Sequence, residues 1–406
     1  MSPTNTMKRR IFIFAVLVIF TLSGCLKIEN HTNVDEQFGY VLSDMPVDFS
    51  GYATRQTAST KADTDYFVDS GSSHLNAGTE FGVFGYFHPK YEVSSTTYPG
   101  GWKDGVNNNH PNLFYNEAVS VSENAGLYSY TYANARYWPK NAYDRISFIA
   151  YYPWSEVNAS NAVVEPFMDT KYEREGMVSF YYTVQEQAED QVDFMVSDLC
   201  LDQSDAAHVQ TGSGKVKFYF HHALSQIRIK SLIVDREENE DVTVTVNYIL
   251  FNNIAVFGQC VPVPDFTPPL AADGRVPVTP TWPVEGLSVR RPHFRDYPTG
   301  ASADVCYDSD ADTWSQEDFL LMIPQTFQPG ANIEVNFDIV RKMGETGEYY
   351  AYTGNTLSAP LTTYEVSGWQ AGKIYYYNIA LNLKEIKISA DVVDWIESGE
   401  DLILDD

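Results

Sequence analysis

Two short segments of the 406-residue chain carry residue types that could hold phosphate or a divalent cation. Residues 211–215, T-G-S-G-K, resemble part of a phosphate-binding loop, but Val209 and Val216 stand where its first Gly and its Mg²⁺-binding Ser or Thr should be. Residues 308–314, D-S-D-A-D-T-W, alternate carboxylates as a calcium loop does, without the Gly and the closing Glu that such a loop needs. We interpret the first segment as a linker and the second as a solvated acidic loop.

Motifs of catalysis give no better candidate. His221 and His222 adjoin in a strand-like segment, so we expect their side chains on opposite sides, one in the core and one at the surface, unable to share one ion. The chain contains no G-x-S-x-G and no H-E-x-x-H. With 54 acidic residues, any choice of a carboxylate pair for glycoside hydrolysis is arbitrary. We therefore predict a protein that is not an enzyme, with no catalytic residue, no metal site and no cofactor.

Cys25 is the residue whose position points to chemistry. Three basic residues, Lys8, Arg9 and Arg10, precede an apolar run that is too short to span a bilayer and is typical of a secretory signal peptide. The run ends in Leu-Ser-Gly-Cys, which resembles the lipobox of bacterial lipoproteins, where the cysteine is lipidated on sulfur and becomes the new N-terminus. An ordinary signal peptide with a chance cysteine is the alternative. Lipidation predicts anchoring in the outer membrane, because acyl chains bury methylene groups in the bilayer.

The net charge of the chain limits the classes of partner that it is expected to bind. Removal of residues 1–24 takes three of the 27 basic residues and none of the 54 acidic ones, so the mature chain carries 30 excess negative charges. We therefore expect no nucleic acid among the ligands of this chain, because phosphate groups would be repelled by its negative charge. Such an acidic surface suits an exported, soluble domain but names no partner. Of the remaining cysteines, Cys260 and Cys306 could form a bridge, or all three, with Cys200, could be free thiols.

The apolar pattern predicts strands. Val47, Phe49 and Gly51 alternate with polar or half-polar residues in V-D-F-S-G-Y-A-T-R, 47–55, which predicts a short strand. Further on, apolar and aromatic segments recur between Gly, Pro, Asn and Asp, and none sustains helical spacing. Near the end, the apolar parity switches close to Lys384, which predicts a strand pair with a bulge or tight turn there.

These segments fit an all-β protein with two antiparallel β-sandwiches in tandem. A polar, glycine-containing stretch near residue 212 suggests the boundary between them. We divide the chain into a signal peptide at 1–24, a tether or propeptide at 25–46, an N-terminal sandwich at 47–212 and a C-terminal sandwich at 213–406.

Several segments, taken in order along the chain, form a recognisable series. Five of them are F-G-V-F-G-Y-F, Y-W-P-K-N-A-Y-D-R-I-S-F-I-A-Y-Y-P-W, D-F-M-V-S-D, F-Y-F-H-H-A-L-S-Q-I-R-I and F-L-L-M-I-P-Q-T-F. The most specific element is W-x-x-G-x-x-Y-x-Y-x-I followed by V-x-D-W, from Trp369 to Trp395. Together these segments resemble the fimbrillin family, the pilin subunits of type V pili in Bacteroidota. The resemblance implies two transthyretin-like domains, export as a lipoprotein, and polymerisation into a cell-surface fimbria that contributes to adhesion.

The resemblance also implies a mechanism of assembly by donor-strand exchange. Residues 47–55 lie where the family's removable first strand lies, and Arg55 where a trypsin-like protease would cut. The donor strand should be C-terminal, at Leu402, Ile403 and Leu404, although these residues could instead form the last edge of the second sandwich. The implied partners are a maturing protease, the outer membrane through lipid on Cys25, and other fimbrial subunits in a homo- or hetero-polymer. The position of the subunit in the stalk, the tip or the anchor is left open.

A surface lipoprotein that binds glycans is the alternative function. Aromatic side chains stack on sugars, and five of them fall within a short stretch that this function would require to be exposed. Such a set would form an aggregation-prone patch, so we expect most of it in the core. The five are Tyr137, Trp138, Tyr151, Tyr152 and Trp154.

Overall fold

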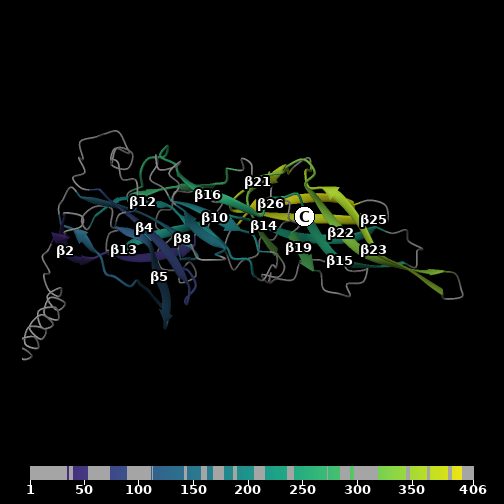
Figure 1. Cartoon of the computed structure of the whole chain (residues 1–406), viewed down its shortest axis with the longest axis horizontal. Helices are drawn as coiled ribbons and strands as arrows, with labels where there is room; N and C mark the ends of the chain where they lie inside the picture. Colours follow the sequence, from purple (N-terminus) through teal and green to yellow (C-terminus); the bar gives the residue numbers. More distant parts are fainter. Residues whose placement is uncertain are drawn as a thin grey trace, which may run out of the picture.

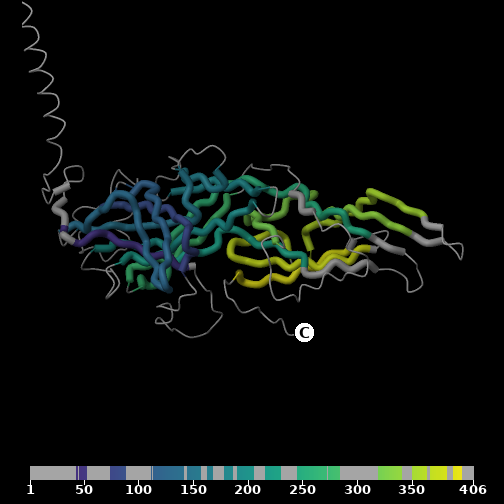
Figure 2. Tube along the Cα trace, turned by 90° about the horizontal axis from the view of Figure 1, so that it is seen from below, coloured from purple at the N-terminus to yellow at the C-terminus, as the bar shows by residue number. Residues whose placement is uncertain are grey.

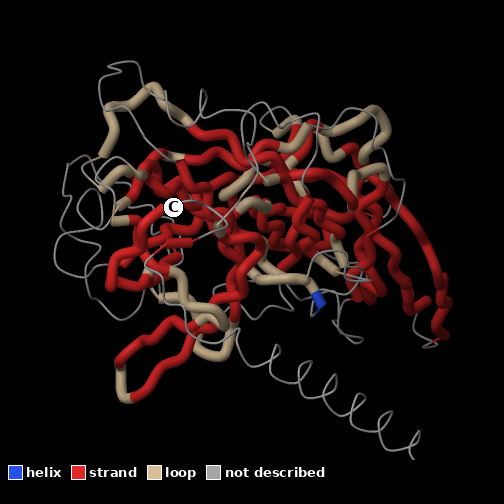
Figure 3. Tube along the Cα trace, turned by 60° about the vertical axis from the view of Figure 1, so that its left-hand side comes forward, coloured by secondary structure: helices blue, strands red, loops and turns tan. Residues whose placement is uncertain are grey.

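The computed structural model of the chain is built almost entirely of strands (Figure 3). The described part of the chain contains no α-helix, and none of its segments is a helix long and apolar enough to cross a membrane. The predicted all-β class is therefore confirmed. The structure describes residues 34–35, 40–53, 74–88, 111, 113–140, 144–156, 162–167, 178–185, 190–204, 215–235, 242–271, 273–283, 293–296, 319–343, 348–363, 366–382 and 386–395.

A nine-stranded sheet lies at the N-terminal end of the elongated molecule, where Figure 1 shows the purple and blue strands. Its main path runs β3-β13-β11-β8-β4-β5-β6, with β12 and β17 attached beside β8. The pairing of β3 with β13 is parallel, and the other pairings of this sheet are antiparallel. The strands are β3 (Asp48–Ala53), β4 (Glu80–His88), β5 (Phe114–Asn124), β6 (Leu127–Thr131), β8 (Arg145–Tyr152), β11 (Met195–Ser197), β12 (Leu199–Gln203), β13 (Lys215–His222) and β17 (Arg275–Val276).

This sheet curls so that its first and last strands, β3 and β6, come into contact. The interior of the curl is an apolar cluster rich in phenylalanine. Nearly every residue of β8 is apolar because both faces of this strand are buried. Phe148 and Ala150 face the interior of the curl, whereas Ile149 and Tyr151 belong to a second cluster on the opposite face.

Two smaller sheets, one of four strands and one of three, are built from strands between Val34 and Thr281. A four-stranded sheet in the order β18-β16-β10-β9 contributes side chains to the second cluster, and a three-stranded sheet has the order β1-β2-β7. Their strands are β1 (Val34–Asp35), β2 (Tyr40–Pro46), β7 (Tyr137–Pro139), β9 (Val164–Phe167), β10 (Ser179–Thr183), β16 (Phe257–Pro264) and β18 (Val278–Thr281).

Two four-stranded sheets form the other end of the molecule, and the hairpin of β22 and β23 runs furthest out (Figure 2). Their orders are β20-β14-β25-β26 and β19-β15-β22-β23, and apolar side chains of both sheets join one cluster. The strands are β14 (Ser225–Asp235), β15 (Val242–Asn252), β19 (His293–Asp296), β20 (Phe319–Met322), β22 (Asn332–Met343), β23 (Glu348–Pro360), β25 (Lys373–Asn382) and β26 (Ile386–Asp394), with a two-stranded pair of β21 (Gln325–Thr326) and β24 (Gly368–Trp369).

The terminal strand pair predicted from the parity switch is confirmed. Strands β25 and β26 pair antiparallel from Lys373 opposite Asp394 to Leu381 opposite Ile386. Trp369 and Trp395, which bracket the pair, are both buried. Gly372 has a positive φ of 66° in the turn that leads into β25, a conformation that suits glycine.

Strand pairing connects segments on both sides of the domain boundary predicted at residue 212. Strand β13 follows that boundary but pairs with β3 and β11, and β16 pairs with β10. The second apolar cluster runs from Phe84 and Phe180 to Trp369. The division into two tandem sandwiches at that residue therefore remains a prediction. Local composition suggested the boundary, but it does not encode which distant segments pair.

Candidate functional site

Strand β3 occupies one end of the strand order of the nine-stranded sheet, and it contains most of the described part of the predicted site. It pairs with β13 in an unbroken parallel register from Asp48 opposite Lys215 to Ala53 opposite Phe220. In the chain, β3 comes before every other strand of its sheet. In the sheet it lies at one end, so that no strand of that sheet's main path lies beyond it. The strand can therefore be removed without cutting the path of the remaining strands.

The side chain of Phe49, on the inner face of β3, lies at the centre of an aromatic cage. Its ring centroid lies 5.3 Å from Phe114, 5.4 Å from Tyr132, and 5.6 Å from both Phe148 and Phe218. The contacts to Phe114 and Phe148 are edge-on, an arrangement that aromatic pairs favour. Phe49 is fully buried, so the inner face of β3 fills a deep apolar groove.

Gly51 shares the inner face of β3 with Phe49, but here the groove is closed. A Cβ atom at this position would lie 3.1 Å from Leu75 Cδ1, 3.1 Å from Phe220 Cε2 and 3.5 Å from Phe81 Cε1. The first two distances are tighter than ordinary carbon contacts. The groove therefore has a large site for the residue at 49, whereas a Cβ atom at 51 would require its neighbours to shift by a few tenths of an ångström.

Two tyrosine hydroxyls hold the backbone of β3. Tyr132 donates to the carbonyl of Val47 at 2.6 Å, and Tyr130 donates to the carbonyl of Gly51 at 3.1 Å. The amide of Leu75 also donates to Gly51, at 3.3 Å, and the amide of Val47 donates to the carbonyl of Arg136 at 2.8 Å. These contacts cover the edge of β3 that faces away from β13, and they bind backbone atoms whatever the side chains are.

Burial raises the pKa of both Tyr130 and Tyr132 above the usual value for tyrosine. In both residues a backbone hydrogen bond acts in the opposite direction and is outweighed by desolvation. The two hydroxyls therefore remain protonated donors at neutral pH.

The outer face of β3 is held less tightly. Asp48 forms a half-exposed ion pair with Lys215 at 3.3 Å, a contact of small stabilising effect. Tyr52 stacks on Tyr219 with 5.6 Å between ring centroids. The Ser50 hydroxyl is buried without a hydrogen-bond partner, which costs free energy in the present arrangement.

The structure bears on only part of the predicted site. Residues 47–53 of the predicted strand 47–55 are described, and β3 begins at Asp48. Cys25, Arg55 and the segment Leu402–Leu404 lie outside the described residues. Sequence reasoning missed the two tyrosines that hold β3 and the closure at Gly51. The alternating tyrosines of the segment L-Y-S-Y-T-Y, 127–132, were the sequence signal from which the two tyrosines that hold β3 could have been found.

The remaining candidates of the sequence serve structural roles. His221 Nε2 lies 2.8 Å from Asp198, and His222 Nδ1 lies 2.8 Å from Asp193 on the other side of the strand, as expected. His222 also stacks on Trp395 with 3.7 Å between ring centroids.

Cys200 and Cys260 are buried free thiols, and Cys306, the other end of the possible bridge, lies outside the described residues. Burial raises the pKa of both thiols.

The aromatic set of the glycan-binding alternative is mostly internal. Trp138 and Tyr151 are fully buried, and Tyr152 and Trp154 are partly buried. Tyr137 alone among the five is exposed, at 38%. These side chains do not form a sugar-stacking platform, because packing of the sheet uses them.

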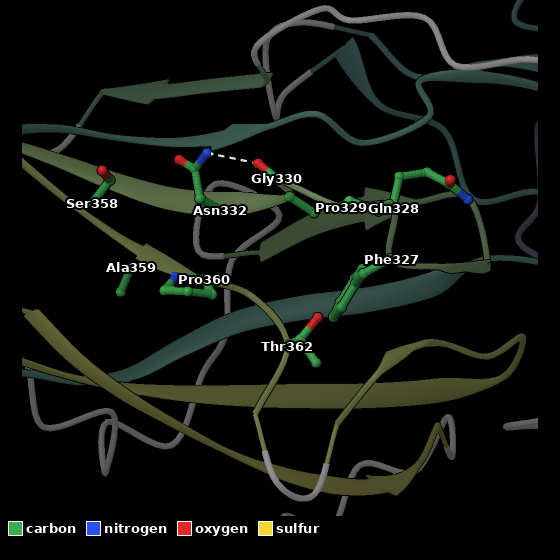
Figure 4. A pocket seen from close by; sticks show the side chains of 10 residues that line it. Phe327, Gln328, Pro329, Gly330, Asn332, Ser358, Ala359, Pro360 and Thr362 are labelled. Carbon is green, nitrogen blue, oxygen red and sulfur yellow. Dashed lines mark hydrogen bonds between the residues drawn. The ribbon is translucent and has the colours of Figure 1, made fainter.

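A surface hollow of about 470 Å³ lies at the start of β22 and the end of β23 (Figure 4). Its lining combines Phe327 and two prolines with neutral polar groups such as Asn332, whose amide donates to Gly330 O at 2.9 Å. None of the ten lining residues carries a titratable side chain. The hollow therefore has no group of its own for acid–base chemistry.

Comparison with known proteins then decides the family. Residues 54–395 match the profile described as Fimbrillin-like. The chain belongs to the fimbrillin-like family. In the fimbrillin-like chain, the match begins directly after the last residue of β3, Ala53.

Individual relatives agree with this assignment. The fimbrillin-like chain is 26% identical over 219 residues to a protein named fimbrium subunit Fim1C of Phocaeicola vulgatus, covering 53% of this chain and 49% of that protein. The chain thus matches about half the length of this curated relative. A crystal structure of a fimbrial protein from Bacteroides vulgatus is similar with a TM-score of 0.53 at 18% identity, covering 86% of this chain and 99% of that one. This likeness shows a shared fold.

A weaker likeness links the chain to a putative cell adhesion protein from Bacteroides uniformis, with a TM-score of 0.43 at 15% identity and coverage of 87% and 99% of the two chains.

Proposed function

We propose that this chain is a structural subunit of a cell-surface fimbria that assembles by exchange of strand β3. Family membership supports the fimbrial role, and the observation that carries the exchange mechanism is the cage around Phe49 in a strand that ends its sheet. Cell adhesion is the associated activity. The buried aromatic set leaves glycan binding without a specific observation in its favour.

The proposed route begins at the membrane. Lipid on Cys25 holds the exported chain to the outer membrane, so that the subunit reaches the site of assembly before it polymerises. A protease then cuts after Arg55, which lies close behind the last residue of β3, Ala53. The cut separates both β3 and the lipidated residue from the body of the subunit.

The physical reason for assembly is the state of the groove after β3 leaves. The backbone groups of β13 from Lys215 to Phe220 lose their partners, and each such group costs about 1–3 kcal/mol when buried without a hydrogen bond. The rings around Phe49 become exposed to water at the same time. Only another strand satisfies both needs, which is the principle of β-augmentation.

The proposed donor is the segment Leu402–Leu404, inserted into the groove of a neighbouring subunit. Leu402 and Leu404 share one parity and offer a short apolar face. Before cleavage the groove is closed to any donor, because β3 is covalently attached and present at a high effective concentration.

The test is whether cleavage makes β3 exchangeable. The mature chain, from residue 26 onward, is treated with mild trypsin and then incubated with a fluorescent peptide of residues 47–53. We expect the cut protein to take up the peptide and retain it in size-exclusion chromatography, and the uncut protein to exclude it. The matched control carries Arg55→Gln and Lys61→Gln, which remove the trypsin sites of this connection.

Failure of the cut, folded protein to take up the peptide of its own β3 contradicts the proposal. Uptake by the uncut protein also contradicts it, since cleavage then has no gating role.

A further inference from the structure

The groove of β3 selects its occupant by size at two positions. At the position of Phe49, four aromatic rings surround a site that holds a benzyl side chain. At the position of Gly51, two carbon atoms already stand 3.1 Å from where a Cβ atom would be. A strand that replaces β3 in the same register therefore needs a large apolar residue at one site and glycine, or at most alanine, at the other.

The atoms that close the groove at Gly51 have little freedom to move away. Phe220 and Phe81 are buried and pack edge-on against each other, with 5.6 Å between centroids. Leu75 is also buried, and its own amide is bonded to the carbonyl of Gly51. A shift of a few tenths of an ångström could admit one methyl group, but a branched or charged side chain requires repacking of the cluster.

The C-terminal segment of this chain does not meet the requirement. Consider each apolar residue of Leu402–Leu404 placed in the site of Phe49, with the strand running in either direction. The residue two positions away, which falls in the site of Gly51, is then always Leu, Asp or Glu. A leucine overfills the closed site, and a carboxylate is buried there among phenylalanine rings without a partner.

We infer that the strand which replaces β3 in this groove comes from a different fimbrial subunit and carries a large apolar residue two positions from a glycine or an alanine. This inference rests on the exchange mechanism proposed above. The tyrosines Tyr130 and Tyr132 bind the backbone of any strand, so side-chain size at the two inner sites decides which subunit is accepted. The segment Leu402–Leu404 of a second copy is therefore a poor donor for this groove, and the subunit occupies a junction between unlike subunits.

The experiment is a competition among peptides for the groove of the trypsin-cut full-length mature protein. Four fluorescent peptides are compared: residues 47–53, the same peptide with Gly51→Leu, residues 400–406, and residues 400–406 with Leu404→Gly. The last peptide places glycine two positions after Leu402. Uptake and dissociation are followed by fluorescence anisotropy, and circular dichroism verifies that the cut protein stays folded.

We expect the peptide of residues 47–53 to bind and the Gly51→Leu change to weaken binding by at least about tenfold. The natural peptide of residues 400–406 should bind no better than the Gly51→Leu peptide, and Leu404→Gly should improve its binding. Equal binding of the natural 400–406 peptide and the 47–53 peptide overturns the inference but leaves strand exchange intact. If the 47–53 peptide itself does not bind, strand exchange fails and the inference fails with it.

Discussion

Phe49 and Gly51 stand two residues apart on the same face of β3 and meet opposite surroundings. The first fills a cage of four aromatic rings, and the second fits because it has no side chain. Packing at native density explains both, since a cavity and an overfilled site each cost free energy. The residue-scale predictions below use these two positions.

Replacing Phe49 with alanine should lower the free energy of unfolding by about 3–5 kcal/mol, because it opens a cavity inside the cage. Urea unfolding followed by circular dichroism measures the change. The matched control is Tyr352→Ala, which removes an aromatic side chain that is 58% exposed and should have little effect. Equal effects of the two substitutions would mean that Phe49 does not carry the packing of β3.

Ser50 and Gly51 should respond in opposite ways to a larger or more apolar side chain. Ser50→Ala removes a buried hydroxyl that has no hydrogen-bond partner, so the free energy of unfolding should stay the same or rise. Gly51→Leu should lower it by about 1–3 kcal/mol through overpacking against Leu75 and Phe220. Thermal unfolding of the two variants provides the measurement, and a Gly51→Leu protein as stable as the parent would show that the groove is open at this position.

At the scale of the element, β3 is held by its backbone as much as by its side chains. Besides the ladder to β13, the carbonyl oxygens of Val47 and Gly51 accept hydrogen bonds from Tyr132 and Tyr130. Hydrogen bonds to the backbone do not depend on the sequence of the strand. They suit the strand exchange that we propose, in which one strand replaces another in the groove.

Tyr132→Phe should loosen β3 without removing a ring from its cage. The substitution leaves the carbonyl of Val47 without its hydroxyl donor, at an expected cost of about 1–3 kcal/mol. Hydrogen exchange at the amides of β3 should accelerate more than exchange in β25, and Tyr352→Phe serves as the surface control. Unchanged protection of β3 would contradict a role of this hydroxyl in holding the strand.

The sequence predicted individual strands better than it predicted which strands pair with each other. The alternation of Val47, Phe49 and Gly51 was sufficient to predict a strand and its inner face, and the parity switch near Lys384 located the pair of β25 and β26. The parallel partner of β3, strand β13, could not be predicted, because periodicity describes one segment and says nothing of which distant segment pairs with it.

The candidate site was predictable to the same extent. Resemblance to a family pointed to residues 47–55 as the strand that we propose to be exchanged, but the closure of the groove at Gly51 depends on Leu75 and Phe220 from two other parts of the chain. No pattern within 47–55 indicates how close these atoms come. The two tyrosines that bind the backbone of β3 were likewise visible only as an aromatic alternation.

At the scale of the whole molecule, many tyrosine side chains and two thiols are buried in both ends of the fold. Burial raises the pKa of Tyr86, Tyr151, Tyr182 and Tyr377, and of the Cys200 thiol, above their usual values. These groups stay protonated in the folded state at a pH where they lose their protons in the unfolded state.

The free energy of unfolding should therefore fall as the pH rises above about 9 to 10, the usual pKa values of thiols and phenols. The contribution is fully present below those values and is lost toward the raised values of the folded state. Urea unfolding at a series of alkaline pH values, with tyrosinate absorbance recorded in parallel, measures both changes. Stability that is constant through this range, with tyrosines titrating normally in the folded protein, would contradict their burial.

The central claim is that β3 belongs to the precursor and is absent from the assembled subunit. N-terminal sequencing of this protein, sheared from the cell surface in polymeric form, tests that claim most directly. We predict that the assembled chain begins at Gln56, directly after Arg55, and carries no lipid. An assembled chain that still begins at Cys25, or at any residue ahead of Val47, would contradict strand removal as the step that permits assembly.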